Sequence, residues 1–154
     1  MFQLVGIDPS PFAQLFALDD AELASRGILR YVAEKPDCYP CRVSLKDADV
    51  GRELLLLSYQ HMPASSPYRA SGPIFVSRAA KAAVLPPGVV PPYVANRLIS
   101  VRAYDGCHMM VSAEVVEGGA LEEEILRMLS DDQVDYLHLH FARRGCFACA
   151  VRRC

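Results

Sequence analysis

The sequence predicts an α+β fold, in which a mainly antiparallel sheet of about five or six strands carries helices on one face. Two patterns indicate this fold. Short segments alternate apolar and polar residues with the period of a strand, and Asp105-Gly106 between two of them is typical of a β-hairpin. Residues 120–129 instead place Leu121 and Ile125 on one side of a helix, with acidic residues in its first turn.

The other elements are predicted mainly from the residues at their ends. Asp19 followed three residues later by Glu22 is typical of a helix capping box, and Gly27 is well placed to end that helix. Residues 84–92 contain four prolines, which predicts an irregular crossing. The remaining apolar segments lie between turn-forming residues and predict strands. We expect these strands at 28–33, 41–45, 52–61, 74–76, 97–105, 108–117, 133–141 and 146–153.

Length and composition exclude several classes of protein. The chain has 154 residues, which is typical of one domain, and we expect residues 1–154 to form a single compact domain. Its 52% hydrophobic content excludes general disorder, and its net charge of −2 argues against a nucleic-acid partner. The sequence shows neither the pattern of a signal peptide nor an apolar run of ~20 residues that could span a membrane. We therefore expect a cytoplasmic protein without a membrane partner.

Alternation along the strands assigns chemistry to faces of the sheet. In the last strand but one, Leu137 and Leu139 share one face, while His138 and His140 share the other. We expect the apolar faces to pack beneath the helices. A solvent-exposed polar face is the simplest alternative, but histidine, tyrosine and arginine are more typical of recognition than of solvated strands. If the strands are neighbours, one surface gathers Arg102, Tyr104, Glu114, Tyr136, His138 and His140.

The arginines on this face predict a small anionic ligand. Thirteen of the sixteen basic residues are arginine, whose planar guanidinium suits carboxylates and phosphates. Arg102 lies between Val101 and Ala103 in a strand, so we expect it to pair with Glu114 or with a ligand. The hypothesis is a domain that binds, or acts on, a small anionic metabolite. The predicted ligand-binding residues are Arg42, Tyr59, His61, Tyr68, Arg69, Arg102, Tyr104 and Arg144.

His138 and His140 are the predicted catalytic residues. An imidazole whose pKa lies near neutrality is suited to acid–base chemistry, whereas the sequence has no nucleophile elbow and no phosphate-binding glycine loop. A zinc site is the alternative use of the same histidines, because zinc takes imidazoles and thiolates as ligands. The candidate zinc ligands are Cys41, His138, His140 and Cys146.

Two further alternatives remain open. The same polar face suits a non-catalytic interaction domain, which would present a flat surface rather than a concave pocket. The pairs Cys38–Cys41 and Cys146–Cys149 have CxxC spacing, but the sequence after Cys41 predicts a strand, whereas thioredoxin-like chemistry needs a helix there.

Several motifs together resemble a known family. They are YPCRVSLKDA at 39–48, SPYR at 66–69, GPIFV at 72–76, RAYD at 102–105, HLH at 138–140 and GCFA at 145–148. The combination is similar to the bacterial domain of unknown function family 1203 over nearly the whole chain. The resemblance implies a small, single-domain bacterial protein, and it implies no activity, substrate or cofactor.

Overall fold

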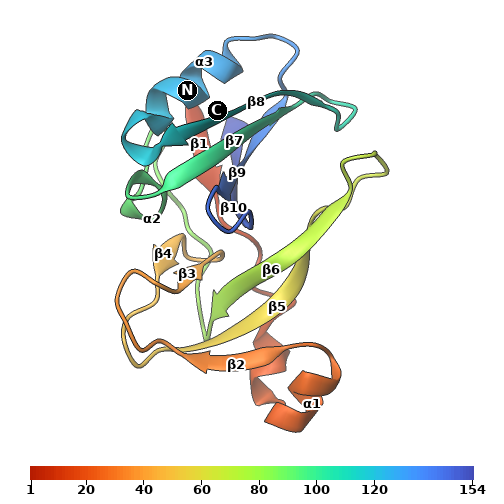
Figure 1. Cartoon of the computed structure of the whole chain (residues 1–154), viewed down its shortest axis with the longest axis vertical. Coiled ribbons are helices and arrows are strands. Elements are labelled where there is room, and N and C mark those ends of the chain that lie inside the picture. The colour runs from red at the N-terminus through yellow and green to blue at the C-terminus, as the bar shows by residue number, and fades with distance from the viewer.

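The structure, a computed structural model, describes all residues 1–154 and contains two five-stranded sheets that lie one above the other (Figure 1). The α+β class and the mainly antiparallel pairing are confirmed: every strand pair except β3–β6 is antiparallel. The strands are divided between two sheets. The upper sheet has the order β1 (Phe2–Val5), β10 (Phe147–Arg153), β9 (Tyr136–Phe141), β7 (Leu98–Tyr104) and β8 (Met110–Glu117).

The lower sheet is built from the first half of the chain. After β1, the chain passes down from the upper sheet, forms the lower sheet, and returns upward through residues 78–91. Both termini therefore lie in the upper half (Figure 1). The order of the lower sheet is β2 (Leu29–Val32), β5 (Glu53–Met62), β6 (Ala70–Ser77), β3 (Pro40–Cys41) and β4 (Lys46–Asp47).

The helix α3 (Leu121–Leu129) packs against the upper sheet as its apolar spacing predicts. Leu121 and Ile125 are fully buried among side chains of β7, β9 and β10. A short turn of 3₁₀ helix, η2 (Gly118–Ala120), leads into it. Gly118 packs against the short helix α2 (Pro92–Ala95), which precedes β7. A Cβ added at Gly118 would be 2.3 Å from the carbonyl oxygen of Val94 in that helix, so this position requires glycine.

The first helix also forms with the predicted ends. After a 3₁₀ turn, η1 (Ala13–Ala17), α1 (Asp20–Ser25) begins with a capping box. The Glu22 N–H donates to Asp19 Oδ1 at 2.8 Å, and the Asp19 N–H donates to Glu22 Oε2 at 3.1 Å. Gly27 follows the helix with a φ of 71°, as its placement predicts. None of the helices is long and apolar enough to cross a membrane.

The predicted strand at 41–45 is wrong. The strand β3 ends at Cys41, and the chain turns back at once into β4 because the Leu45 N–H donates to the Cys41 carbonyl at 3.0 Å. Leu45 takes a positive φ of 51° in this turn and is almost fully buried. The turn also carries Arg42 into the interior, where it lies between the two sheets.

Buried apolar side chains form two main clusters. The larger contains nineteen residues between α3 and the upper sheet, and the smaller contains twelve around the lower sheet, α1 and η1. Phe147 of the upper sheet belongs to the cluster of the lower sheet, so the two layers share a packed boundary. That the whole chain folds as a single domain stays a prediction.

Candidate functional site

The predicted polar face of the upper sheet exists. In the register of β7 and β9, Arg102 lies opposite His138 and Ser100 lies opposite His140. Directly opposed residues of antiparallel strands point to the same side, so these four side chains share one face. The tip of the β5–β6 hairpin reaches up to cover it, and Ser66 in this tip donates a hydrogen bond to the His108 carbonyl at 2.9 Å (Figure 1).

His61, near the end of β5, joins the two histidines of β9. Its ring centroid lies 5.0 Å from that of His140 and 6.1 Å from that of His138. On its other side His61 stacks on Phe147, with the rings 9° from parallel and 5.2 Å apart. We call His61, His138 and His140 the histidine cluster. The sequence names all three of its members, but not the ring of Phe147 that supports them.

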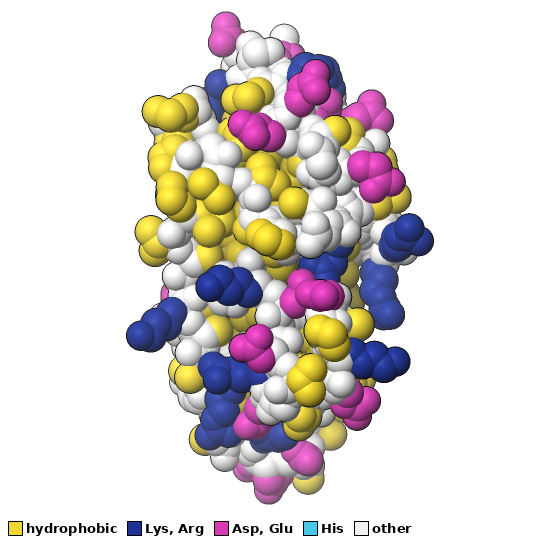
Figure 2. Space-filling model, turned by 90° about the vertical axis from the view of Figure 1, so that its left-hand side faces the viewer, with side chains coloured by type: hydrophobic (Ala, Val, Ile, Leu, Met, Phe, Trp, Pro, Cys, Tyr) yellow, Lys and Arg dark blue, Asp and Glu magenta, His cyan; other side chains and the backbone are white.

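The histidine cluster is an interior feature. His138 and His140 are only 6% and 1% exposed, because the lower sheet covers the face that alternation placed outside the apolar layer. Consistent with this burial, no histidine is visible on the molecular face drawn in Figure 2. The expectation of a pKa near neutrality is wrong for both. Burial, together with neighbouring positive charge, lowers the pKa of His138 to about 3 and that of His140 to about 4.

Each histidine of the cluster has a ring nitrogen without a protein partner. The Nδ1 of His140 lies 3.1 Å from the Gly145 carbonyl oxygen, which can only accept a hydrogen bond. Nδ1 of the neutral ring therefore carries the hydrogen, and Nε2 carries the lone pair. This Nε2 atom is buried and unpaired, as are the Nδ1 atoms of His61 and His138. Three such atoms in one cluster depart from the rule that buried polar groups are paired.

Arg102 lies beside the cluster without a carboxylate partner. Its Nε donates to Ser100 Oγ at 3.3 Å, and it takes part in none of the ion pairs of the molecule. After burial, its positive charge is the main cause that lowers the pKa of His61 and of His140. The positive charge of the guanidinium therefore further disfavours protonation of imidazoles that burial already keeps neutral.

The expected Arg102–Glu114 pair is wrong. Glu114 lies opposite Val101 in the β7–β8 register, and thus on the side of the sheet that faces α3. Ala113 is the residue opposite Arg102, and the apolar side of β8 shares the Arg102 face, with Val115 about half exposed. Alternation separates the two faces of β8 correctly, but it does not reveal which face points to the helix. The sequence predicts that Arg102 pairs with Glu114 or with a ligand. Because Glu114 lies on the other face, a ligand is the remaining expected partner.

A row of tyrosines continues the same face towards the β7–β8 turn. Tyr104 and Tyr136 stack with their ring centroids 5.3 Å apart, and Tyr68 from the hairpin tip meets Tyr104 edge-on at 6.1 Å. The Tyr136 hydroxyl lies 2.9 Å from Nδ1 of His108, a residue that the sequence did not single out. Burial raises the pKa of Tyr136 to about 12, so its hydroxyl remains a hydrogen-bond donor.

A cleft of about 710 Å³ opens between the hairpin tip and the upper sheet. His61 and Met62 line it from the hairpin, His138 and Tyr136 from β9, and Arg152 from β10. Arg152 forms no ion pair, and alternation places it on the same face as Tyr136, its partner in the β9–β10 register. A concave site thus adjoins the histidine cluster, and it carries an arginine that sequence reasoning missed.

Of the eight predicted ligand-binding residues, only His61 lines this cleft. Tyr68, Arg102 and Tyr104 lie on the same face beside it, and the other four lie elsewhere. Tyr59 is half-buried between Phe12 and Phe147, at 6.2 and 6.3 Å between ring centroids. Arg69 and Arg144 are exposed in turns. Arg42 is buried, and its guanidinium contacts carbonyl oxygens and a thiol rather than a cavity. The structure therefore brings together His61, Tyr68, Arg102, Tyr104, His138 and His140 from the predicted set.

The predicted zinc ligands are not assembled. The Cys41 thiol is buried in the lower sheet and accepts a hydrogen bond from the Ser77 N–H at 3.3 Å. The Cys146 thiol accepts from Arg42 Nη2 at 3.1 Å and packs towards the core beneath α3, away from the histidine face. No group of three or more histidine, cysteine, aspartate or glutamate side chains is arranged to hold a metal ion. The set Cys41, His138, His140 and Cys146 therefore does not form a metal centre.

Comparison with known proteins identifies the family. A family model described as protein of unknown function (DUF1203) matches residues 38–153, which include the strands β5 and β9 that carry the histidine cluster. No curated protein and no solved structure matches the chain. Because the family model covers most of the sequence, the chain belongs to the DUF1203 family.

Proposed function

We propose that this protein binds a small anionic metabolite in the cleft beside the histidine cluster. One observation carries the proposal: Arg102 is a half-buried guanidinium without a carboxylate partner, next to three neutral imidazoles. Buried or half-buried charges in proteins are normally paired. Arg102 does not itself line the cleft, but it lies opposite His138, which does. An anion held between His138 and Arg152 would supply negative charge beside Arg102. A cation is a poorer ligand for this face, because the same guanidinium repels it.

The shape of the site favours a small ligand over a protein partner. An interaction domain calls for a flat face with its side chains splayed, whereas here the hairpin tip and the upper sheet enclose a cleft of about 710 Å³. This volume is within the range typical of small-molecule sites. We also propose a bacterial cytoplasmic setting for the protein. All six cysteines are free, which supports a reducing compartment.

Binding should be linked to the uptake of protons. An anion beside the cluster favours the charged form of the imidazoles and so raises their pKa values from the depressed values of the free protein. The bound form then takes up protons at a higher pH than the free form. By linkage, the affinity for the anion rises as the pH falls below about 6.5, towards the lower pKa values of the free protein.

A ligand screen tests the proposal. Thermal unfolding is followed with small di- and tricarboxylates and phosphorylated metabolites, and calorimetry then gives the affinity of each ligand that stabilises the fold. A ligand at a hundredfold excess over its Kd stabilises the folded state by about 2.7 kcal/mol. For such a ligand, Arg102→Gln should weaken binding about tenfold or more, because a charge-assisted contact is lost.

The control is Arg144→Gln, which removes an exposed arginine from the β9–β10 turn and should leave affinity unchanged. Equal losses in both variants would show that the anion responds only to overall charge. An affinity that is constant between pH 7 and pH 5 would contradict the proton linkage. If no anion in the screen stabilises the protein, the proposed function is wrong.

A further inference from the structure

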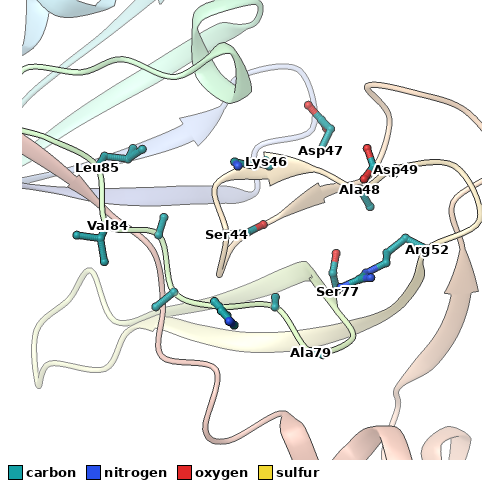
Figure 3. A pocket seen from close by; sticks show the side chains of 14 residues that line it. Ser44, Lys46, Asp47, Ala48, Asp49, Arg52, Ser77, Ala79, Val84 and Leu85 are labelled. Carbon is teal, nitrogen blue, oxygen red and sulfur yellow. The ribbon is translucent and has the colours of Figure 1, made fainter.

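A second pocket lies at the opposite end of the β5–β6 hairpin, and the proposed function does not use it. It has a volume of about 500 Å³ and lies between the β3–β4 hairpin and the returning segment 79–85 (Figure 3). Arg52, which lines this pocket, precedes β5, whereas His61 stands near the far end of that strand. An extended strand of this length separates the two pockets by about 30 Å.

The second pocket has an excess of positive charge. Lys46, Arg52 and Lys81 line it, and none of them forms an ion pair. Of the two acidic residues in the lining, Asp47 is already held by Arg97, with contacts of 2.6 and 3.0 Å. Asp49 is then the only acidic side chain left to oppose three cationic ones. Two of the three lysines of the chain are placed here.

Hydroxyl groups add neutral hydrogen-bond donors to this charge. Figure 3 shows the hydroxyls of Ser44 and Ser77 turned towards the same space as Lys46 and Arg52. Ser77 is only 7% exposed, so its position is set by the fold rather than by solvent. Serine hydroxyls beside lysine and arginine provide the donors that an oxyanion requires.

The buried Cys41 thiol contacts Ser77 but does not itself line the pocket. It accepts a hydrogen bond from the Ser77 N–H at 3.3 Å. Burial by itself raises the pKa of this thiol, but hydrogen bonds from Ser44 and Ser77 outweigh it and lower the pKa below the usual value. Ser44 and Ser77, which both line the pocket, therefore lie close to one another.

The opposite wall is mostly apolar. Apart from Lys81, residues 79–85 are alanines followed by Val84 and Leu85, and they line the pocket across from the β3–β4 hairpin (Figure 3). A bare inorganic ion would leave this wall unused. A phosphate that carries a small carbon skeleton would contact both the cationic rim and the alanine-rich wall.

We propose that this pocket binds the phosphate group of a small phosphomonoester. Lys46, Lys81 and Arg52 supply the charge, and Ser44 and Ser77 supply the hydroxyl donors. The site is independent of the cleft at the histidine cluster, so either can be wrong without the other.

The test is a titration of the full chain with glycerol phosphate and, separately, with inorganic phosphate, followed by ¹H–¹⁵N NMR. The amides of residues 44, 46, 77 and 81 should shift together and give one Kd. Lys46→Gln and Lys81→Gln should each weaken binding about tenfold, since each removes a charged contact. Ser77→Ala should weaken binding without changing charge. The matched control is Lys35→Gln, an exposed lysine outside the pocket, and it should bind as the parent does.

Three results would overturn the proposal. The first is equal weakening in the Lys35, Lys46 and Lys81 variants, which would mean that phosphate responds to surface charge alone. The second is the same affinity for inorganic phosphate as for glycerol phosphate, which would remove the ester from the proposal. The third is a loss of glycerol phosphate binding in Arg102→Gln, which would place the ligand in the other cleft.

Discussion

Replacing Arg42 with methionine is expected to lower the free energy of unfolding by about 3–5 kcal/mol. The side chain is 1% exposed, and its three donor groups are all used: Nε donates to Phe147 O at 2.8 Å, Nη1 to Pro40 O at 2.6 Å, and Nη2 to Cys146 Sγ at 3.1 Å. Its guanidinium also lies 5.0 Å from the centre of the Phe141 ring. Methionine fills a similar volume but leaves these buried acceptors unpaired.

Urea denaturation followed by circular dichroism measures this loss. Arg42→Lys should fall between the parent and Arg42→Met, because it keeps the charge but not the planar fork of donors. Arg143→Met, in the exposed β9–β10 turn, is the control and should change the free energy by less than about 0.5 kcal/mol. A loss below about 1 kcal/mol in Arg42→Met would contradict the role assigned to these contacts.

The same denaturation curves test whether residues 1–154 behave as a single domain. Arg42 lies in the turn between β3 and β4 of the lower sheet, whereas Cys146, Phe147 and Phe141 belong to the upper sheet and its β9–β10 turn, so the side chain joins the two layers. The parent should unfold in one cooperative transition. Two separate transitions in the parent would show that the sheets fold as separate units.

Acidification from pH 7 to pH 5 is expected to destabilise the fold by about 2 kcal/mol for each of His138 and His140. Their pKa values in the folded protein are about 3 and about 4, below the ordinary 6.5 of the unfolded chain. The unfolded state therefore binds protons first as the pH falls. The contribution of the two histidines to the free energy of unfolding is present above about pH 6.5. It decreases as the pH falls below that value and continues to decrease until the pH passes the folded pKa values.

Stability curves at half-unit steps between pH 8 and pH 5 measure this effect before most carboxylates titrate. His138→Gln with His140→Gln should be less stable than the parent at pH 7, because two buried rings are replaced, yet its stability should vary less between pH 7 and pH 5. A parent whose stability is constant over this range would contradict the burial of neutral imidazoles. A double variant with the same slope as the parent would assign the effect to other groups.

Local patterns in the sequence predicted much of the local structure, although not the turn that follows Cys41. The capping box of α1 and the buried side of α3 both form, because each depends on residues three or four positions apart. The face shared by His138 and His140 follows for the same reason, since alternation is a property of one strand. The α+β class follows from the sum of these elements.

What the sequence could not predict depends on contacts between distant segments. The burial of His138 and His140 results from a hairpin that is far from β9 in the chain, so no pattern within 133–141 reveals it. The side of Glu114 depends on which face of β8 meets α3. Cys41 and Cys146 looked like ligands because of their chemistry, but each thiol accepts a hydrogen bond from a residue that is distant in sequence, Ser77 and Arg42 respectively.

The order of strands in the upper sheet has a consequence for the course of folding. The strand β10 lies between β1 and β9, so the only strand that pairs with β1 is the one farthest from it along these residues. Closing so long a loop costs conformational entropy before the pairing contributes any stability. The β1 edge of the upper sheet is therefore expected to form late, after the hairpins whose strands are close in sequence.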